Sequence, residues 1–369
     1  MALVEISQRG LYCSAGDFYV DPWSPVDRAV ITHSHSDHLR WGSKKYLTAT
    51  PNVPVLRARV GDVDVAGAAY GESVDIHGVR VSFHPAGHIL GSAQVRIEHR
   101  GEVCVVSGDY KTDGDPTCPP FEPLRCNHFI TEATFALPIY RWPRTSDVMR
   151  EFDAWWQANQ AEGRTSVVFA YALGKAQRVL SEITNVRGPI LIHGALARFA
   201  PIYAAAGVEL PATEYASQEA VRAAKGAALV VAPPSALGSP WLRKFGPVST
   251  AVASGWMRVR GARRRRGVDR GFVLSDHADW PGLCWAIAET GAEEVWVTHG
   301  YTEPMTRYLN EQGKVCARAI ETRFKGEGAD EGEATPEEAG ANVEIAPLPP
   351  LPAAVASPET LPTAGEAAT

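Results

Sequence analysis

The stretch HSHSDH, residues 33 to 38, places three histidines and an aspartate in six positions of a chain that has only 11 histidines among 369 residues. It follows the apolar run AVIT. If the segment is extended, residues two apart share a face, so His33, His35 and Asp37 point the same way and His38 lies beside them as the chain turns. Imidazole and carboxylate ligands suit Zn, Mn or Fe. The spacing therefore favours a metal site over a surface pH switch or a chance cluster.

Four further segments share one pattern, an apolar β run that ends abruptly in ionisable side chains. VCVVSGDYK ends in Asp109, HFITEAT in Glu132, FVLSDHADW in Asp276 and His277, and VWVTHG in His299. The ends of buried strands are where α/β sheets collect their functional residues. These five residues are therefore candidates for the same site.

The segment FHPAGHILGS adds His84 and His88, four residues apart. Pro85 and Gly87 between them rule out a helical pair. We therefore expect only one ligand, the glycine-flanked His88, and a structural role for His84. The remaining histidines have no such ionisable or glycine-flanked motif around them and are predicted to be surface or core residues: His77, His99, His128 and His193.

The composition is that of an ordinary globular protein, with 45% apolar and 21% charged residues. The length favours two folded units, or one large unit with an insertion. No run of about 18 apolar residues occurs, and the opening MALVEISQRG lacks the features of a secretory signal. We therefore expect a cytoplasmic protein without a membrane span. Six scattered cysteines without a CxxC pair favour reduced thiols over disulfides or a cysteine zinc site.

The last 44 residues, 326–369, contain nine acidic residues and no lysine or arginine. Subtracting these nine from the total of 42 leaves 33 acidic against 36 basic residues in 1–325, a net charge of +3. A body of that sign can approach a polyanion, although +3 over such a length is a weak signal. The segment is rich in Ala, Glu, Pro and Gly and has no aromatic residue, which predicts a disordered tail.

The pattern of predicted secondary structure changes twice along the chain. Residues 1 to about 135 contain short Val-, Ile- and Phe-rich runs separated by Gly, Pro and Asp, which predict strands and turns. From about 145 the stretch SDVMREFDAWWQANQAEG predicts a helix with a capping serine, and alternating strand and helix units follow it. Strand-then-helix units resume from about 268. The alternation is typical of a parallel α/β sheet.

Six motifs occur in a fixed order: THSHSDH, GHILGS, SGDYK, TEATF, SDHAD and THG. The set resembles the metallo-β-lactamase superfamily and, more narrowly, the β-CASP nucleases. Long stretches, including FHPAGHILGSAQV and FAYALGKAQR, look like the bacterial ligase-associated DNA exonucleases, a family also described as exonucleases of the mRNA 3′-end processing type. The resemblance covers about residues 5 to 320.

This resemblance implies an α/β fold in which a metallo-β-lactamase αββα sandwich carries an inserted β-CASP α/β domain. Residues 1–142 and 268–325 would form the sandwich, and residues 143–267 the insertion. Small-molecule hydrolases of this fold, such as thioesterases and lactonases, lack the insertion. The resemblance therefore implies a nuclease.

The resemblance also implies two divalent metal ions, with Zn favoured and Mn as the alternative. His33, His35 and His88 would hold one metal, Asp37, His38 and His299 the second, and Asp109 would bridge the pair. Glu132 and His277 correspond to the first and second β-CASP motifs. Two metals about 3.5–4 Å apart can activate a shared water and clamp a phosphoryl oxygen. Asp37 could orient that water, and His277, paired with Glu132 or Asp276, is the candidate acid that protonates the leaving oxygen.

Two segments are candidates for contacts with substrate phosphates. ALGKAQ puts Gly174, Lys175 and Gln177 at a strand-to-helix turn, where unpaired N–H groups and a lysine can hold a phosphate, although an ordinary helix start has the same pattern. MRVRGARRRRG precedes the His277 motif with six arginines, of which Arg263, Arg264, Arg265 and Arg266 form a run. An arginine run is often only a solvated face, but this one leads into a candidate catalytic strand.

We therefore expect a metal-dependent DNA exonuclease with a preference for 5′ ends, acting in repair beside a DNA ligase and a helicase. The alternatives are an RNA nuclease of the RNase J or mRNA 3′-end processing type and, more distantly, a small-molecule hydrolase. His299 favours RNA, because the DNA-repair branch of the family typically has an apolar residue there.

Overall fold

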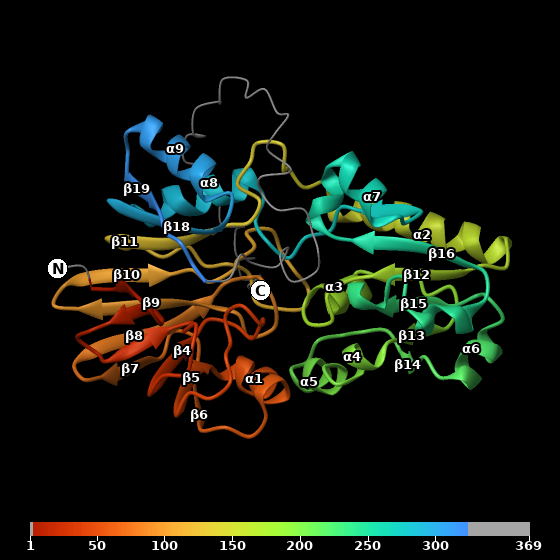
Figure 1. Cartoon of the computed structure of the whole chain (residues 1–369), viewed down its shortest axis with the longest axis horizontal. Helices are drawn as coiled ribbons and strands as arrows, with labels where there is room; N and C mark the ends of the chain where they lie inside the picture. The colour runs from red at the N-terminus through yellow and green to blue at the C-terminus, as the bar shows by residue number, and fades with distance from the viewer. Residues whose placement is uncertain (1–2, 324–369) are drawn as a thin grey trace, which may run out of the picture.

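Three β-sheets with helices on their outer faces make up the computed structural model (Figure 1). The structure describes residues 3–323, with the side chains of residues 260, 262 and 263 left aside. The predicted α/β class is confirmed. The predicted disordered tail, residues 326–369, lies outside the described residues.

Two of the sheets pack face to face. The first sheet runs β1 (Glu5–Ser7), β2 (Gly10–Cys13), β3 (Phe18–Val20), β4 (Arg28–Ile31), β5 (Lys45–Ala49) and β6 (Val65–Ala68), in that order. The second runs β19 (Cys316–Ala319), β18 (Glu294–Gly300), β11 (His128–Ala133), β10 (Glu102–Val106), β9 (Ala93–His99), β8 (Val79–Pro85) and β7 (Ser73–Ile76). Both sheets mix parallel and antiparallel neighbours.

The interface between the two sheets is a continuous apolar core. Val30 of β4 and Ala49 of β5 belong to the same buried cluster as Val81 of β8 and Val95 of β9. Helix α1 (Val53–Val60) covers the outer face of the first sheet through Leu56. Helices α8 (Trp280–Thr290) and α9 (Thr302–Gln312) cover the outer face of the second. The result is a helix, sheet, sheet, helix arrangement, which is consistent with a metallo-β-lactamase type of fold.

The third sheet is entirely parallel. Its order is β14 (Glu214–Tyr215), β13 (Ile190–Ile192), β15 (Leu229–Ala232), β12 (Thr165–Phe169), β16 (Val248–Ala253) and β17 (Arg270–Phe272). Helices α2 (Thr145–Ala161) and α3 (Lys175–Ser181) pack on one face, and α6 (Gln218–Ala224) packs on the other. Short helices α4 (Gly194–Ala197), α5 (Ala200–Ala205) and α7 (Arg260–Arg266) complete this part of the chain. The parallel sheet predicted for this region is present.

The whole third sheet lies, in sequence, between two strands that are direct neighbours in the second sheet. β11 pairs with β18 in parallel, and the chain between them contains β12 to β17. Two details differ from the sequence-based predictions. Strand β17 pairs with β16, so the chain leaves the third sheet after Phe272 and not at 267. The cap of α2 is Arg144, without a side-chain hydrogen bond, so Ser146 does not cap this helix.

All six cysteines are free thiols. Among the described residues, no helix combines the length and the apolar character that crossing a bilayer requires.

Candidate metal centre

Most of the candidate residues lie in the last residues of strands of the two packed sheets or in the segments that follow these strands. HSHSDH begins two residues after β4 ends at Ile31, and Asp109 follows β10, which ends at Val106. Glu132 and His299 lie within the last residues of β11 and β18. Because these strands end at the same side of the molecule, their side chains meet although they are far apart in sequence.

Two groups of potential ligand atoms include residues of HSHSDH. His33, His35, His88 and Asp109 form the first group, and Asp37, His38 and His299 form the second. Within each group the atoms lie within 4.8 Å of one another. HSHSDH thus contributes His33 and His35 to one group and Asp37 and His38 to the other, and His88, not His84, joins the first group. His84 lies instead 3.1 Å from the Ser82 hydroxyl and 3.5 Å from the Glu122 carboxylate.

Asp109 lies between the two groups. Its Oδ2 atom is 3.5 Å from Nε2 of His33 and 3.8 Å from Nε2 of His88. Its Oδ1 atom is 3.3 Å from Nε2 of His38. One carboxylate therefore presents one oxygen to each group, which is the arrangement that a shared ligand requires.

Three of the histidines are oriented through their outer ring nitrogens. Nδ1 of His38 lies 2.7 Å from Oδ2 of Asp21, and Nδ1 of His88 donates to the Asp276 carbonyl at 2.8 Å. Nε2 of His35 donates to the Leu173 carbonyl at 3.1 Å. Such bonds fix which nitrogen faces a metal and increase its basicity. The inner atoms are therefore Nδ1 of His35 and Nε2 of His38 and His88.

The donor set fits divalent metal ions. Among the described residues, Nε2 of His33, Nε2 of His38 and Oδ2 of Asp37 are buried and make no hydrogen bond. Buried polar atoms normally have partners, and metal ions held by the two groups would supply partners for these three atoms. Imidazole nitrogens and carboxylate oxygens without thiolate suit Zn or Mn.

Burial and the neighbouring charges shift the pKa values of this cluster in opposite directions. Burial alone would lower the pKa of His38, but the carboxylates of Asp109 and Asp37 raise it well above its usual range. Burial alone would raise the pKa of Asp109, but His38 and the other histidines hold it well below its usual range. Burial and the neighbouring His277 and His35 lower the pKa of His88 to about 4. A neutral His88 and an ionised Asp109 are the forms that bind a metal.

Backbone geometry at two positions permits this convergence. Gly108 has φ +57°, and a Cβ there would lie 2.7 Å from Thr32, so only glycine lets Asp109 approach the end of β4. His299 also has a positive φ, 55°, which is uncommon for a residue with a side chain. Such conformations are concentrated at functional sites.

His277 and Glu132 form a buried pair next to the first group. Nδ1 of His277 lies 2.9 Å and 3.0 Å from the two carboxylate oxygens of Glu132. The sequence left open whether Glu132 or Asp276 is the partner of His277, and the structure pairs it with Glu132. Asp276 instead lies 3.2 Å from Nζ of Lys175.

The two predicted phosphate-binding residues of ALGKAQ, Lys175 and Gln177, already have partners within the protein. The side chain of Lys175 is only 3% exposed, and its ammonium group pairs with Asp276. Gln177 caps α3, because its Oε1 accepts from the Gly174 N–H at 2.8 Å while its Nε2 donates to the Ala172 carbonyl at 3.0 Å. The N–H of Gly174 is thus already paired, and the expectation of an unpaired N–H at this glycine is wrong. A substrate contact by Lys175 or Gln177 stays a prediction.

The arginine run forms helix α7. Arg264 and Arg265 are exposed and Arg266 is half-buried, whereas the side chain of Arg263 is outside the described ones. Burial raises the pKa of Tyr301, and the charge of Arg265 acts in the opposite direction. Arg265 therefore lies within electrostatic range of a residue two positions after His299.

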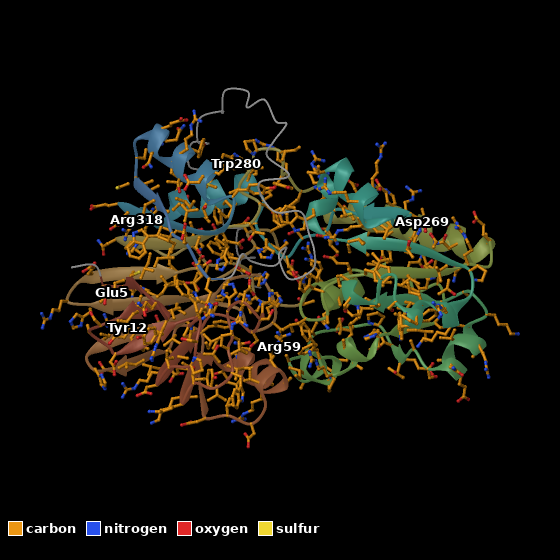
Figure 2. The ribbon with its side chains drawn as sticks, in the orientation of Figure 1. Glu5, Tyr12, Arg59, Asp269, Trp280 and Arg318 are labelled. Atoms are coloured by element: carbon orange, nitrogen blue, oxygen red, sulfur yellow. The ribbon has the colours of Figure 1, made fainter. Side chains whose placement is uncertain are left out.

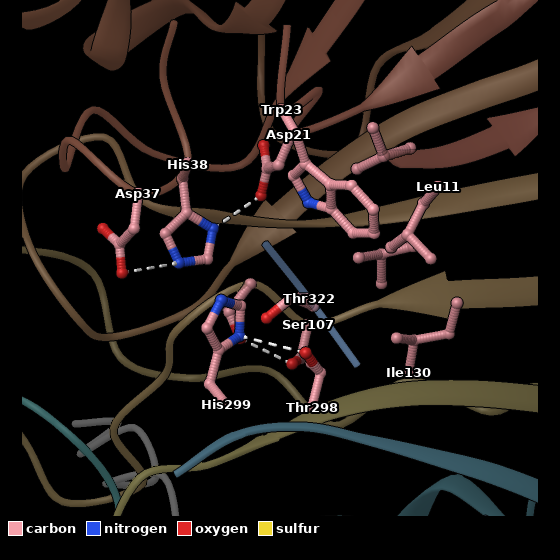
Figure 3. A pocket seen from close by; sticks show the side chains of 13 residues that line it. Leu11, Asp21, Trp23, Asp37, His38, Ser107, Ile130, Thr298, His299 and Thr322 are labelled. Carbon is pink, nitrogen blue, oxygen red and sulfur yellow. Dashed lines mark hydrogen bonds and ion pairs between the residues drawn. The ribbon is translucent and has the colours of Figure 1, made fainter. Parts of the chain in front are cut away.

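Asp21 is a site residue that the sequence analysis missed. Its Oδ2 faces His38 (Figure 3). The same Oδ2 accepts from the Thr32 hydroxyl at 2.6 Å, and Oδ1 accepts from the Thr32 N–H at 2.8 Å. A cavity of about 30 Å³ adjoins Asp21, His38 and His299. The signal was present, because Asp21 directly follows the strand Phe18–Val20 just as Asp109 follows another apolar run.

We expect Asp21→Asn to weaken metal binding at the second group by about 10- to 100-fold, because the charge that orients His38 is lost. Asparagine tolerates the left-handed backbone of this position, φ 44°. Metal titration of the metal-free protein measures both sites. Asp17→Asn is the matched control, since Asp17 pairs with Arg28 at the surface and also has a positive φ. Equal second-site affinities in the two variants would contradict a positioning role for Asp21.

The comparisons with known proteins agree with this geometry. No protein-family model matches the chain. A "Probable DNA ligase" of Opitutus terrae is 28% identical over 308 residues, which cover 82% of this chain and 30% of the relative. Cleavage and polyadenylation specificity factor 73 of Drosophila melanogaster is 25% identical, over 46% of this chain and 26% of the relative. An RNase J-like protein of Methanocaldococcus jannaschii is 24% identical, over 48% of this chain and 47% of the relative.

A solved structure has the same overall fold. It is a protein of unknown function from Enterococcus faecalis V583, with a TM-score of 0.55 and 12% identity, covering 81% of this chain and 80% of that one. The chain spans less than a third of the length of the first curated relatives that it matches. These relatives show that the chain is related to the metallo-β-lactamase and β-CASP nucleases.

Proposed function

We propose that this chain is a metal-dependent nuclease that hydrolyses phosphodiester bonds in DNA. The observation that carries the proposal is the pair of buried ligand groups that share Asp109. Relatives with names from nucleic-acid processing support it. The segment that holds the third sheet would be the β-CASP insertion.

The residues around the ligand groups have separate roles in this proposal. Two divalent ions held there would activate a water and stabilise negative charge on the phosphoryl oxygens. Asp37 would orient the attacking water. Glu132 holds Nδ1 of His277, so that ring can exchange a proton with the substrate only at Nε2. His277 would therefore protonate the leaving oxygen. Asp276, which precedes His277 in the chain and pairs with Lys175, would support His277 indirectly.

DNA is preferred over RNA because the match to the "Probable DNA ligase" covers 82% of the chain. That name also supports action beside a DNA ligase. The proposed removal of nucleotides one by one from 5′ ends rests on the family resemblance alone. RNA is the second candidate, since several relatives carry names from RNA processing, among them an endoribonuclease of Saccharomyces cerevisiae.

One experiment tests both the activity and the choice of substrate. End-labelled single-stranded DNA and RNA of matched sequence are incubated with the protein and Zn²⁺, Mn²⁺ or Mg²⁺. We expect shortening of the DNA from its 5′ end. Digestion of RNA alone would reject the DNA assignment but keep the nuclease, and digestion of neither would reject both.

The arginine helix α7 gives a separate prediction about binding. Replacing Arg264 and Arg265 together by alanine should weaken DNA binding and reduce the slope of log affinity against log salt by about two, one per lost phosphate contact. Binding is measured by anisotropy at several salt concentrations. Arg222→Ala, at an exposed position of α6, is the control. An unchanged slope in the double variant would make the run an ordinary solvated face.

A further inference from the structure

A cavity of about 60 Å³ lies directly beside the ligand groups. Its lining combines metal-site residues with residues of α1 and of the turn before α3: His35, Ser36, Asp37, Arg59, Tyr171, Ala172 and Leu173. The cavity is therefore bounded by the part that contains the two packed sheets and by the part that contains the third sheet. Arg59 supplies the cavity with a permanent positive charge.

Packing brings Arg59 to this place. Val55 of α1 belongs to one buried cluster with Leu173, Phe199 and Tyr203. The last turn of α1, which carries Arg59, therefore faces the segment that leads into α3 and the start of α5. Figure 2 labels Arg59 where these parts of the molecule meet.

Arg59 and Arg198 together bring two positive charges to this place, against the single negative charge of Asp37. Burial and the nearby Arg198 lower the pKa of Arg59, and Asp37 acts in the opposite direction. Among the described residues, no hydrogen bond or ion pair engages the Arg59 side chain. Arg198 is exposed, and its guanidinium lies 4.7 Å from the centre of the Phe199 ring. Asp37 belongs to the second ligand group, so its charge would be shared with a metal.

A partly buried cation beside a second cation is unfavourable unless an anion joins them. The guanidinium group is suited to phosphate, because its planar N–H donors form paired hydrogen bonds with phosphoryl oxygens. We propose that Arg59, with Arg198, binds a phosphate of the substrate strand next to the one that is cleaved. This inference rests on the proposed nuclease function and adds a residue that fixes the position of the strand.

The test compares Arg59→Ala and Arg59→Lys with Arg57→Ala, a control on the exposed face of the same helix. For a single-stranded oligonucleotide, we expect Arg59→Ala to raise KM by about 10- to 100-fold. This factor corresponds to the loss of a hydrogen bond to a charged group. The salt slope of binding should fall by about one. Arg59→Lys should lie between Arg59→Ala and wild type, because it keeps the charge but loses the paired donors. Thermal unfolding checks that each variant is folded.

Inorganic phosphate provides a readout without turnover. Its affinity for the full chain, measured by calorimetry, should fall in Arg59→Ala and stay unchanged in Arg57→Ala, since both variants retain the ligand groups. Equal KM, salt slope and phosphate affinity in these two variants would overturn the subsite. A wild-type protein that cleaves no nucleic acid, yet binds phosphate through Arg59, would reject the proposed function and leave the anion site in place.

Discussion

Replacing His277 by alanine is expected to lower the rate of nucleic-acid cleavage by about 10²- to 10⁴-fold, the usual contribution of a general acid. The metal content should stay near that of the wild type. The reason is the pairing of His277 with Glu132, which occupies Nδ1 and leaves proton transfer to Nε2. The ring is almost completely buried, so its loss also removes a contact with Phe135.

Metal analysis of the purified variant and single-turnover kinetics separate the two possible roles of His277. His277 also lies within ligand distance of His88 and Asp276, which makes this separation necessary. Loss of a metal would show that His277 is a ligand and not an acid. His84→Ala is the matched control, because His84 lies outside the ligand groups of the described residues.

The sequence predicted which segments would carry the candidate ligands, because all of these residues except the glycine-flanked His88 follow an apolar run. Periodicity alone did not predict how HSHSDH divides between two groups. An extended strand would direct His33, His35 and Asp37 to one face, but the chain turns after His35, whose carbonyl accepts from the N–H groups of His38 and Leu39. The family resemblance, and not the spacing, implied the division.

Contacts between distant segments were the least predictable part. The ion pair between Lys175 and Asp276 joins residues about a hundred positions apart, and no local pattern distinguishes this lysine from an exposed one at a helix start. For a similar reason, residues 270–272 were predicted to belong to the sandwich, whereas they form β17 of the third sheet. A run such as GFVL predicts a strand, whereas the sheet that it joins depends on backbone pairing with β16.

The fold and the comparisons also explain why the general chemistry is easier to predict than the substrate. The ligand set depends on residue types in short motifs, which are visible in the sequence. Substrate choice depends on the surface between the parts of the molecule, where Arg59 and α7 lie, and the names of the relatives include both DNA and RNA proteins.

Replacing Asp109 by asparagine is expected to remove both metals and to reduce cleavage to the background rate. The amide side chain would be the same size but neutral, and neither ligand group would keep its shared charged oxygen. By comparison, His299→Ala should release only the metal of the second group, because His299 belongs to that group alone. Metal content per chain and thermal unfolding of the metal-free proteins measure the difference. If Asp109→Asn retains one metal at wild-type affinity, Asp109 serves a single group, and its role as a ligand shared by both groups has to be abandoned.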